Sequence, residues 1–203
     1  MPRPEGDAVS SDRTRDQAWK VLKESEVFRA KRRMRITCQT VQLPDNRVID
    51  DYYRVYFPEA VIIVAVTKDR KVVMTRQYNH GYGRVSILLP AGTIENNDDP
   101  LATARRELLE EAGYVSARWR LLGSYWQHTN YGCGKLNFFL ALDAVRTAEP
   151  VSGDLEEMEI VTLPVPNIAH AIRAGDIVSI GTITALTLAK LSRRAPVTEE
   201  TGL

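Results

Sequence analysis

The sequence predicts an α/β fold with a small additional sheet ahead of the main domain. Three observations predict this class. Residues 60–66 form an unbroken apolar run rich in β-branched side chains, which is typical of a strand buried on both faces. Residues 99–113 combine helical spacing of apolar side chains with signals for both helix ends. Further strand and helix patterns then alternate along the chain, as they do in α/β domains.

The N-terminal part divides into a tail and a group of strands. Residues 1–16 are rich in Pro, Gly, Ser, Arg and Asp and lack apolar periodicity, so we expect a disordered tail. In residues 17–57, three strands are expected at 26–30, 34–42 and 50–57, with a turn at 44–46. We interpret this region as a small sheet that precedes the main domain.

The main domain is expected to span residues 58–195, with a flexible tail at 196–203. Its central strand at 60–66 leads through a turn at 68–70 into a second strand, as in a hairpin. The clearest helix has Asp99 as N-cap and Pro100 in its first turn, and it ends at Gly113. The other expected elements are strands at 71–76, 87–89, 119–126, 136–142 and 160–163, a Gly-rich loop at 81–83, and helices at 168–174 and 182–192.

Composition argues against several classes of function. The chain has 27 basic and 26 acidic residues, so no global positive field favours nucleic acid or membrane partners. Cys38 and Cys133 lack metal-ligand spacing, and we interpret them as reduced. The longest apolar run is far too short to span a bilayer, and the N-terminus is polar rather than signal-like. We therefore expect a cytoplasmic protein.

Three carboxylates gather on one side of the predicted helix. Glu107, Glu110 and Glu111 are spaced i, i+3 and i+4, so they lie beside the apolar stripe that packs on the domain. One interpretation is a solvated acidic helix face. The other is a cation site, because clustered carboxylate oxygens suit Mg²⁺ or Mn²⁺, ions that commonly bind substrate phosphates at the same time.

The surrounding residues favour the cation site. From Gly92 to Tyr114 the sequence resembles the Nudix box, G-x5-E-x7-R-E-U-x-E-E-x-G-U, in which U is apolar. One position differs, because Asp98 stands where the family has Glu. The resemblance implies an α-β-α sandwich with a mixed sheet, preceded by a small N-terminal antiparallel sheet.

The resemblance also implies roles for the residues of the box. Glu107, Glu110 and Glu111 would bind Mg²⁺, which Mn²⁺ could replace, together with the backbone carbonyl of Ala91. Glu111 and Arg106 would act in catalysis, with Arg106 orienting Glu107 or the loop. Gly92 and Asp98 would anchor that loop, with Asp98 paired to Arg106.

Beyond the box, the chain is most similar to ADP-ribose pyrophosphatases and nucleoside-diphosphate-sugar hydrolases. Residues 76–78, the Gly-rich loop and residues 89–92 carry this likeness. It implies hydrolysis of a nucleotide sugar such as ADP-ribose to a nucleoside monophosphate and a sugar phosphate, by a homodimer built through the N-terminal strands. The chain departs from this branch at Leu88, at Asn79 and at Thr129 and Asn130, where Glu, Arg and Pro are usual.

Other candidate site residues lie outside the box. The likeness places a catalytic base in the late acidic segment, where we favour Glu156 and Glu157, although an exposed acidic loop is an equal alternative. We expect Glu159, at the start of a strand, to point away from the site. Arg76 and Arg54 are candidates for phosphate or nucleobase binding, against the alternative of surface arginines. Tyr125, Trp126 and Tyr131 suit either base stacking or packing.

Two other functions are alternatives to a hydrolase of nucleotide sugars. A sensor that retains the Nudix fold but binds nucleotide sugar with little or no catalysis stays open, because such modules commonly lose a box glutamate and Asp98 replaces one here. The complete set of three helix glutamates favours the enzyme. RNA processing would need a basic groove, and a net charge of +1 gives it no support.

Overall fold

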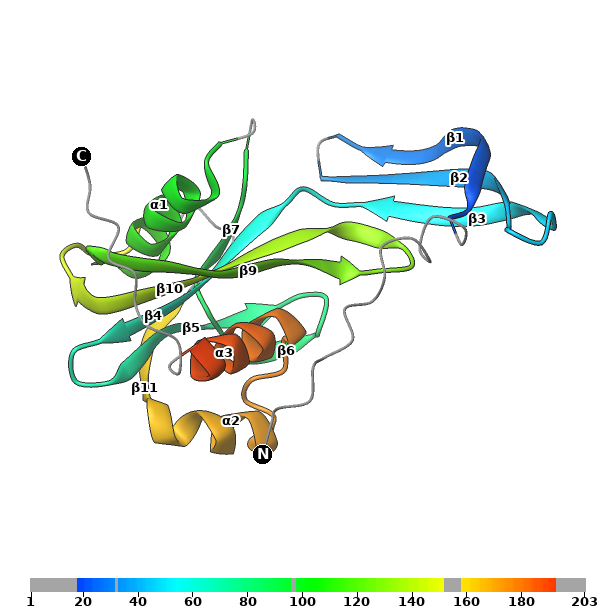
Figure 1. Ribbon diagram of the computed structural model, residues 1–203. Coiled ribbons are helices and arrows are strands. Elements are labelled where there is room, and N and C mark those ends of the chain that lie inside the picture. The colour runs from blue at the N-terminus through cyan, green and yellow to red at the C-terminus, as the bar shows by residue number, and fades with distance from the viewer. Residues whose placement is uncertain (1–17, 32, 96–97, 152–157, 193–203) are drawn as a thin grey trace, which may run out of the picture. The chain divides into compact units, whose positions relative to one another are not determined.

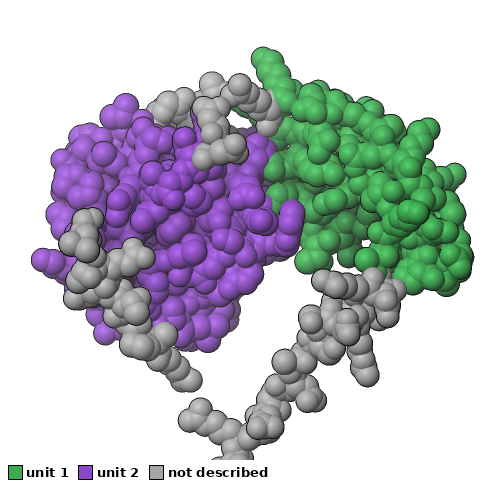
Figure 2. Space-filling model, turned by 45° about the horizontal axis from the view of Figure 1, so that its top comes forward, with its two compact units in different colours: residues 1–57, 128–134 green, residues 58–127, 135–203 purple. Residues whose placement is uncertain are grey.

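The computed structural model describes residues 18–31, 33–95, 98–151 and 158–192 (Figure 1). The chain divides into two compact units, coloured separately in Figure 2. Residues 1–57 and 128–134 make up the first unit, and residues 58–127 and 135–203 make up the second.

The first unit is built on an antiparallel sheet of β1 (Lys20–Ala30), β2 (Met34–Gln42) and β3 (Val48–Tyr56). A tight turn with Asn46 at positive φ joins β2 to β3, as the Pro, Asp and Asn at this point predict. The tip formed by residues 128–134 adds to β3, because Gly132 pairs in parallel with Val55. β1 is an edge strand whose side chains are almost all exposed.

The second unit contains a mixed sheet in the order β10-β4-β5-β11. β4 (Ala60–Thr67) runs parallel to β10 (Gly132–Arg146) and antiparallel to β5 (Lys71–Asn79), which pairs in turn with β11 (Glu159–Pro164). The remaining strands pair with these four: β6 (Arg84–Leu88), β7 (Ala91–Thr93), β8 (Tyr114–Val115) and β9 (Arg118–His128). The central position expected for residues 60–66 is confirmed.

Helices cover both faces of this sheet, and β4 contributes to both cores. Val61, Ile63 and Ala65 pack in the core beneath α1 (Pro100–Ala112). The alternate side chains of β4 pack in the other core, with α2 (Ile168–Ala174) and α3 (Ile180–Ser192). A short 3-10 turn, η1 (Val165–Asn167), precedes α2. The second unit is therefore an α-β-α sandwich, as predicted (Figure 1).

The ends of α1 follow the predicted capping. The side chain of Asp99 accepts a hydrogen bond from the N–H of Ala102 at 2.8 Å, and Pro100 occupies the first turn. Gly113 ends the helix at φ 72°, a left-handed conformation that glycine adopts without strain. In the described ranges, no helix has the length and apolarity needed to cross a membrane.

Candidate active site

The acidic residues of α1 lie against the short strand β7, and a glycine makes this approach possible. A Cβ atom added at Gly92 would overlap the carboxyl carbon, one carboxylate oxygen and the Cγ of Glu107. The side chain of Glu107 is only 12% exposed, so it has little room to move away. Glycine at position 92 therefore sets how closely Glu107 approaches the loop backbone.

A second contact ties the same helix to the same strand. The backbone N–H of Ala91 donates a hydrogen bond to Oε2 of Glu111 at 2.9 Å. Ala91 is held in turn by β4, where its partner in the ladder is Ile62. Two of the three glutamates thus meet the backbone of residues 91–92, and this region also contains the Ala91 carbonyl that we predict as a metal ligand.

Arg106 connects Glu107 and Glu110. Its Nη2 lies 2.6 Å from Oε1 of Glu107, and its Nη1 lies 2.7 Å from Oε2 of Glu110. Burial disfavours the charged form of Arg106, but the two carboxylates outweigh this effect and raise its pKa. The guanidinium therefore stays charged and holds the two glutamates beside each other.

The expected ion pair between Asp98 and Arg106 is not formed. Asp98 lies ahead of the helix, where its N–H bonds to the carbonyl of Glu95 at 2.8 Å. Arg106 is two turns into α1, and carboxylates one and four residues further along are its partners. Glu107 and Glu110 both lie within about one helical turn of Arg106. The guanidinium therefore contacts these two carboxylates, and not the carboxylate of Asp98.

The donor chemistry at α1 fits a divalent cation, although the carboxylates do not converge. Glu107, Glu110 and Glu111 offer the hard oxygen ligands that Mg²⁺ and Mn²⁺ prefer. Among the residues that the structure describes, no three acidic, His or Cys side chains are gathered tightly enough to hold a metal ion. Instead Arg106 supplies the positive charge between two of the glutamates. Each of these contacts involves one carboxylate oxygen, so the second oxygen of either glutamate could still bind a cation.

Arg76 lies in the second unit, in β5. Its Nη1 is 3.3 Å from Oε2 of Glu159, its partner in the ladder between β5 and β11. Both side chains are largely exposed, so this ion pair is weak and can be exchanged for another anion. Glu159 thus faces a predicted substrate-binding residue, whereas we expected its side chain to point away from the site.

The other predicted site residues are placed differently. Arg54 lies in β3 of the first unit, with its guanidinium carbon 5.2 Å from the centre of the Tyr56 ring. Glu156 and Glu157 are outside the described residues. Tyr125, Trp126 and Tyr131 are about half exposed, which leaves base stacking open as a role for them.

The chain is similar to known proteins over most of its length. A family model described as NUDIX domain matches residues 56–176. Over 144 residues, 71% of this chain and 76% of the relative, the sequence is 30% identical to a methanol dehydrogenase activator of Bacillus methanolicus. Over 122 residues, 60% of this chain and 65% of the relative, it is 28% identical to an ADP-ribose pyrophosphatase of Bacillus subtilis.

A solved structure has the same fold. The crystal structure of an ADP compounds hydrolase superposes with a TM-score of 0.76 and covers 86% of this chain and 94% of its own. The two sequences are 22% identical, so this likeness concerns the fold.

Proposed function

Because the chain belongs to the NUDIX domain family, we propose that it hydrolyses the pyrophosphate bond of a nucleoside diphosphate derivative. ADP-ribose or a related nucleotide sugar is the proposed substrate, and a nucleoside monophosphate and a sugar phosphate are the products. Support for this substrate class comes from the pyrophosphatase relative and from residues 76–78 and 89–92.

The observation that carries the proposal is the junction between α1 and β7. Glu107 occupies the space that a side chain at position 92 would take, and Glu111 accepts the Ala91 N–H. Two carboxylates and a stretch of backbone are thereby held next to each other. Such positioning is what phosphoryl chemistry requires, since catalysis depends mainly on placing charge accurately.

Glu107, Glu110 and Glu111, with the carbonyl of Ala91, are proposed to hold Mg²⁺, and Mn²⁺ is proposed to substitute. When bound, such a cation supplies positive charge that neutralises the pyrophosphate and makes phosphorus more open to attack by water. Arg106 contacts both Glu107 and Glu110, and its positive charge reduces the repulsion between these neighbouring carboxylates.

The proton of the attacking water is proposed to pass to Glu156 or Glu157. A carboxylate is a suitable base for a water molecule whose attack develops negative charge on phosphate oxygens. Arg76 is proposed to bind the substrate phosphates by exchanging its exposed partner Glu159 for them. Arg54 is a second candidate for contact with the nucleotide.

The proposed assembly is a cytoplasmic homodimer that uses the N-terminal strands. β1 is an edge strand, and several large apolar side chains on it are exposed: Val21, Leu22, Val27 and Phe28. An exposed apolar edge strand tends to pair with another chain. A second copy of this sheet would cover it in a symmetric way.

A substrate panel tests the activity. The purified chain would be incubated with ADP-ribose, GDP-mannose, NADH, diadenosine polyphosphates and nucleoside triphosphates, with Mg²⁺ or with a chelator, and the products separated by chromatography. We expect ADP-ribose or another nucleotide sugar to be cleaved at its pyrophosphate, only with the metal. Binding of ADP-ribose without turnover would favour the sensor and contradict the proposed hydrolase.

A further inference from the structure

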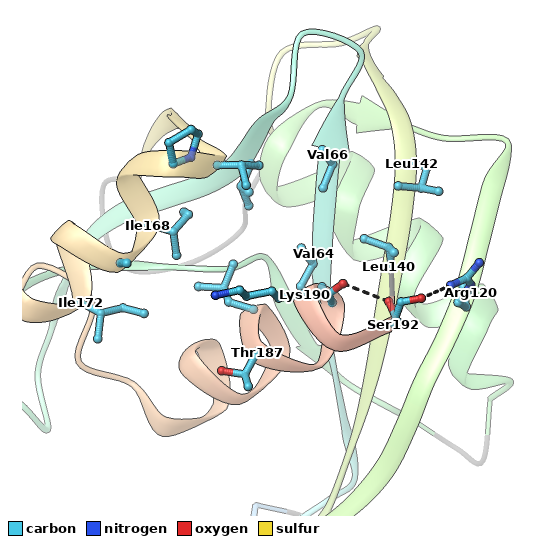
Figure 3. A pocket seen from close by; sticks show the side chains of 16 residues that line it. Val64, Val66, Arg120, Leu140, Leu142, Ile168, Ile172, Thr187, Lys190 and Ser192 are labelled. Carbon is cyan, nitrogen blue, oxygen red and sulfur yellow. Dashed lines mark hydrogen bonds between the residues drawn. The ribbon is translucent and has the colours of Figure 1, made fainter. Parts of the chain in front are cut away.

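A cavity lies on the face of the sheet opposite to α1. It has a volume of about 630 Å³, within the range of about 300–1,000 Å³ that is usual for small-molecule sites. Its floor is formed by neighbouring strands, with Val64 and Val66 from β4 and Leu140 and Leu142 from β10 (Figure 3). Helices α2 and α3 form its walls, and every residue that lines it belongs to the second unit.

The walls are mostly apolar. Ile168 and Ile172 of α2 face the strands, and Leu186 of α3 completes the apolar lining. Such surfaces gain free energy when they contact an apolar ligand rather than water. The cavity therefore favours an occupant with an apolar body.

The guanidinium of Arg120 lies against this largely apolar lining. Arg120, on β9, donates from Nη1 to the carbonyl of Ser192 at the end of α3, at 3.0 Å (Figure 3). Its Nη2 is buried and, within the described part of the chain, lacks a hydrogen-bond partner. A buried charged donor without an acceptor is unfavourable, so an acceptor brought by a ligand would bind strongly here.

The charge of the lining is entirely positive. Lys190 of α3 lies on the same cavity as Arg120, and no Asp or Glu is among the described residues that line it. The acidic residues of α1 pack on the other face of the sheet. This cavity therefore favours an anion, in contrast to the carboxylate cluster, which favours a cation.

We propose that the cavity binds a small organic anion with an apolar body, such as a medium-chain carboxylate. Its carboxylate accepts a hydrogen bond from Nη2 of Arg120 and is attracted by Lys190. Its hydrocarbon part lies against Val64 and Leu140. This site is separate from the proposed hydrolytic site and does not depend on the hydrolase proposal.

Calorimetric titration of the full chain tests the proposal, with decanoate as the probe. Decanol has the same apolar body without the charge, and decyltrimethylammonium has the opposite charge. We expect one saturable site for decanoate, with each control ligand bound at least about tenfold more weakly, as for the loss of one charge-assisted hydrogen bond. Equal binding of decanoate and decanol, or no saturable binding of decanoate, would overturn the proposal.

Two variants separate the contribution of the charge from that of the cavity. Arg120→Met keeps an unbranched side chain but removes the donors, so decanoate should bind about tenfold more weakly while decanol is unaffected. Arg173→Met, on the exposed end of α2 and away from the cavity, is the matched control and should bind like the parent. Undiminished decanoate binding by Arg120→Met would overturn the role of this guanidinium.

Obstructing the cavity tests its location. Ala169 of α2 belongs to the lining and is exposed, so Ala169→Trp adds a large side chain at the rim of the cavity, and we expect it to obstruct decanoate binding with little change in the thermal midpoint. Because Arg120 is intact in this variant, retained binding would place the probe elsewhere and overturn the assignment. Binding of decanoate only after removal of residues 193–203 would also overturn it, because the chain itself would then be the occupant.

Discussion

Replacing Gly92 by Ala tests the junction between α1 and β7. The added Cβ would overlap three atoms of the Glu107 side chain, so that side chain must adopt another rotamer. This change would break the 2.6 Å contact between Oε1 of Glu107 and Nη2 of Arg106. The backbone itself can accept alanine, because Gly92 is not among the residues at positive φ.

The expected size of the effect follows from this overlap. Overpacking of a well-packed position costs about 1–3 kcal/mol, which lowers the thermal midpoint by roughly 2–4 °C per kcal/mol in a chain of this size. Displacement of a catalytic group by about 1 Å can reduce the rate on the order of a hundredfold, or about 2.7 kcal/mol in transition-state stabilisation. We therefore expect a large loss of turnover with a modest loss of stability.

The assay is hydrolysis of ADP-ribose with Mg²⁺, together with thermal denaturation. Gly81→Ala is the matched control, because a Cβ added at Gly81 meets no atom within 4 Å. In a Glu107→Ala background, Gly92→Ala should no longer destabilise the chain, since the atoms that it would overlap are gone. Full turnover in Gly92→Ala, or equal destabilisation of the chain in both backgrounds, would show that contact between position 92 and Glu107 does not position this side chain.

Three further changes give distinct results. Glu111→Gln keeps the shape of the side chain but removes its charge. Most hydrolysis should therefore be lost while the thermal midpoint is unchanged, and near-full turnover would contradict the role of Glu111 as a metal ligand. Of Glu156→Gln and Glu157→Gln, one should lower the rate with little change in Mg²⁺ affinity, and full activity in both would mean that the base lies elsewhere. Val27→Glu combined with Phe28→Lys should convert the proposed dimer to a monomer, as measured by light scattering. The control Ile180→Glu, on the exposed start of α3, should leave the dimer intact. A parent chain that is already monomeric would contradict the proposed dimer.

Elements with local signals could be predicted closely. The bounds of α1 follow from Asp99, Pro100 and Gly113, and α2 has the bounds that were expected. β7 and β8 were missed because strands of three and two residues show no periodicity. β7 exists because it pairs with β4, which is distant in the sequence. β1 is longer than predicted for a similar reason, since pairing with β2 extends it to Lys20.

The candidate site was predictable in its residue types but not in its contacts. The spacing of the three glutamates placed them beside the apolar stripe of one helix. The family resemblance implied that Arg106 would orient Glu107 or the loop, but nothing indicated that it would also bind Glu110 and not Asp98. The hydrogen bond from the Ala91 N–H was also unpredictable, because every residue except proline has this donor and the sequence carries no mark of its use.

The tip at residues 128–134 limits how the N-terminal unit can be exchanged between proteins. The chain leaves the first unit after residue 57, returns to it at residue 128 and leaves it again after residue 134. Val55 and Tyr52 both bond to backbone carbonyls of this tip, at Tyr131 and Asn130. A recombination event that transferred only residues 1–57 would carry these donors away from their acceptors. The N-terminal strands and this tip are therefore expected to be inherited together, and chimeras should exchange both segments at once.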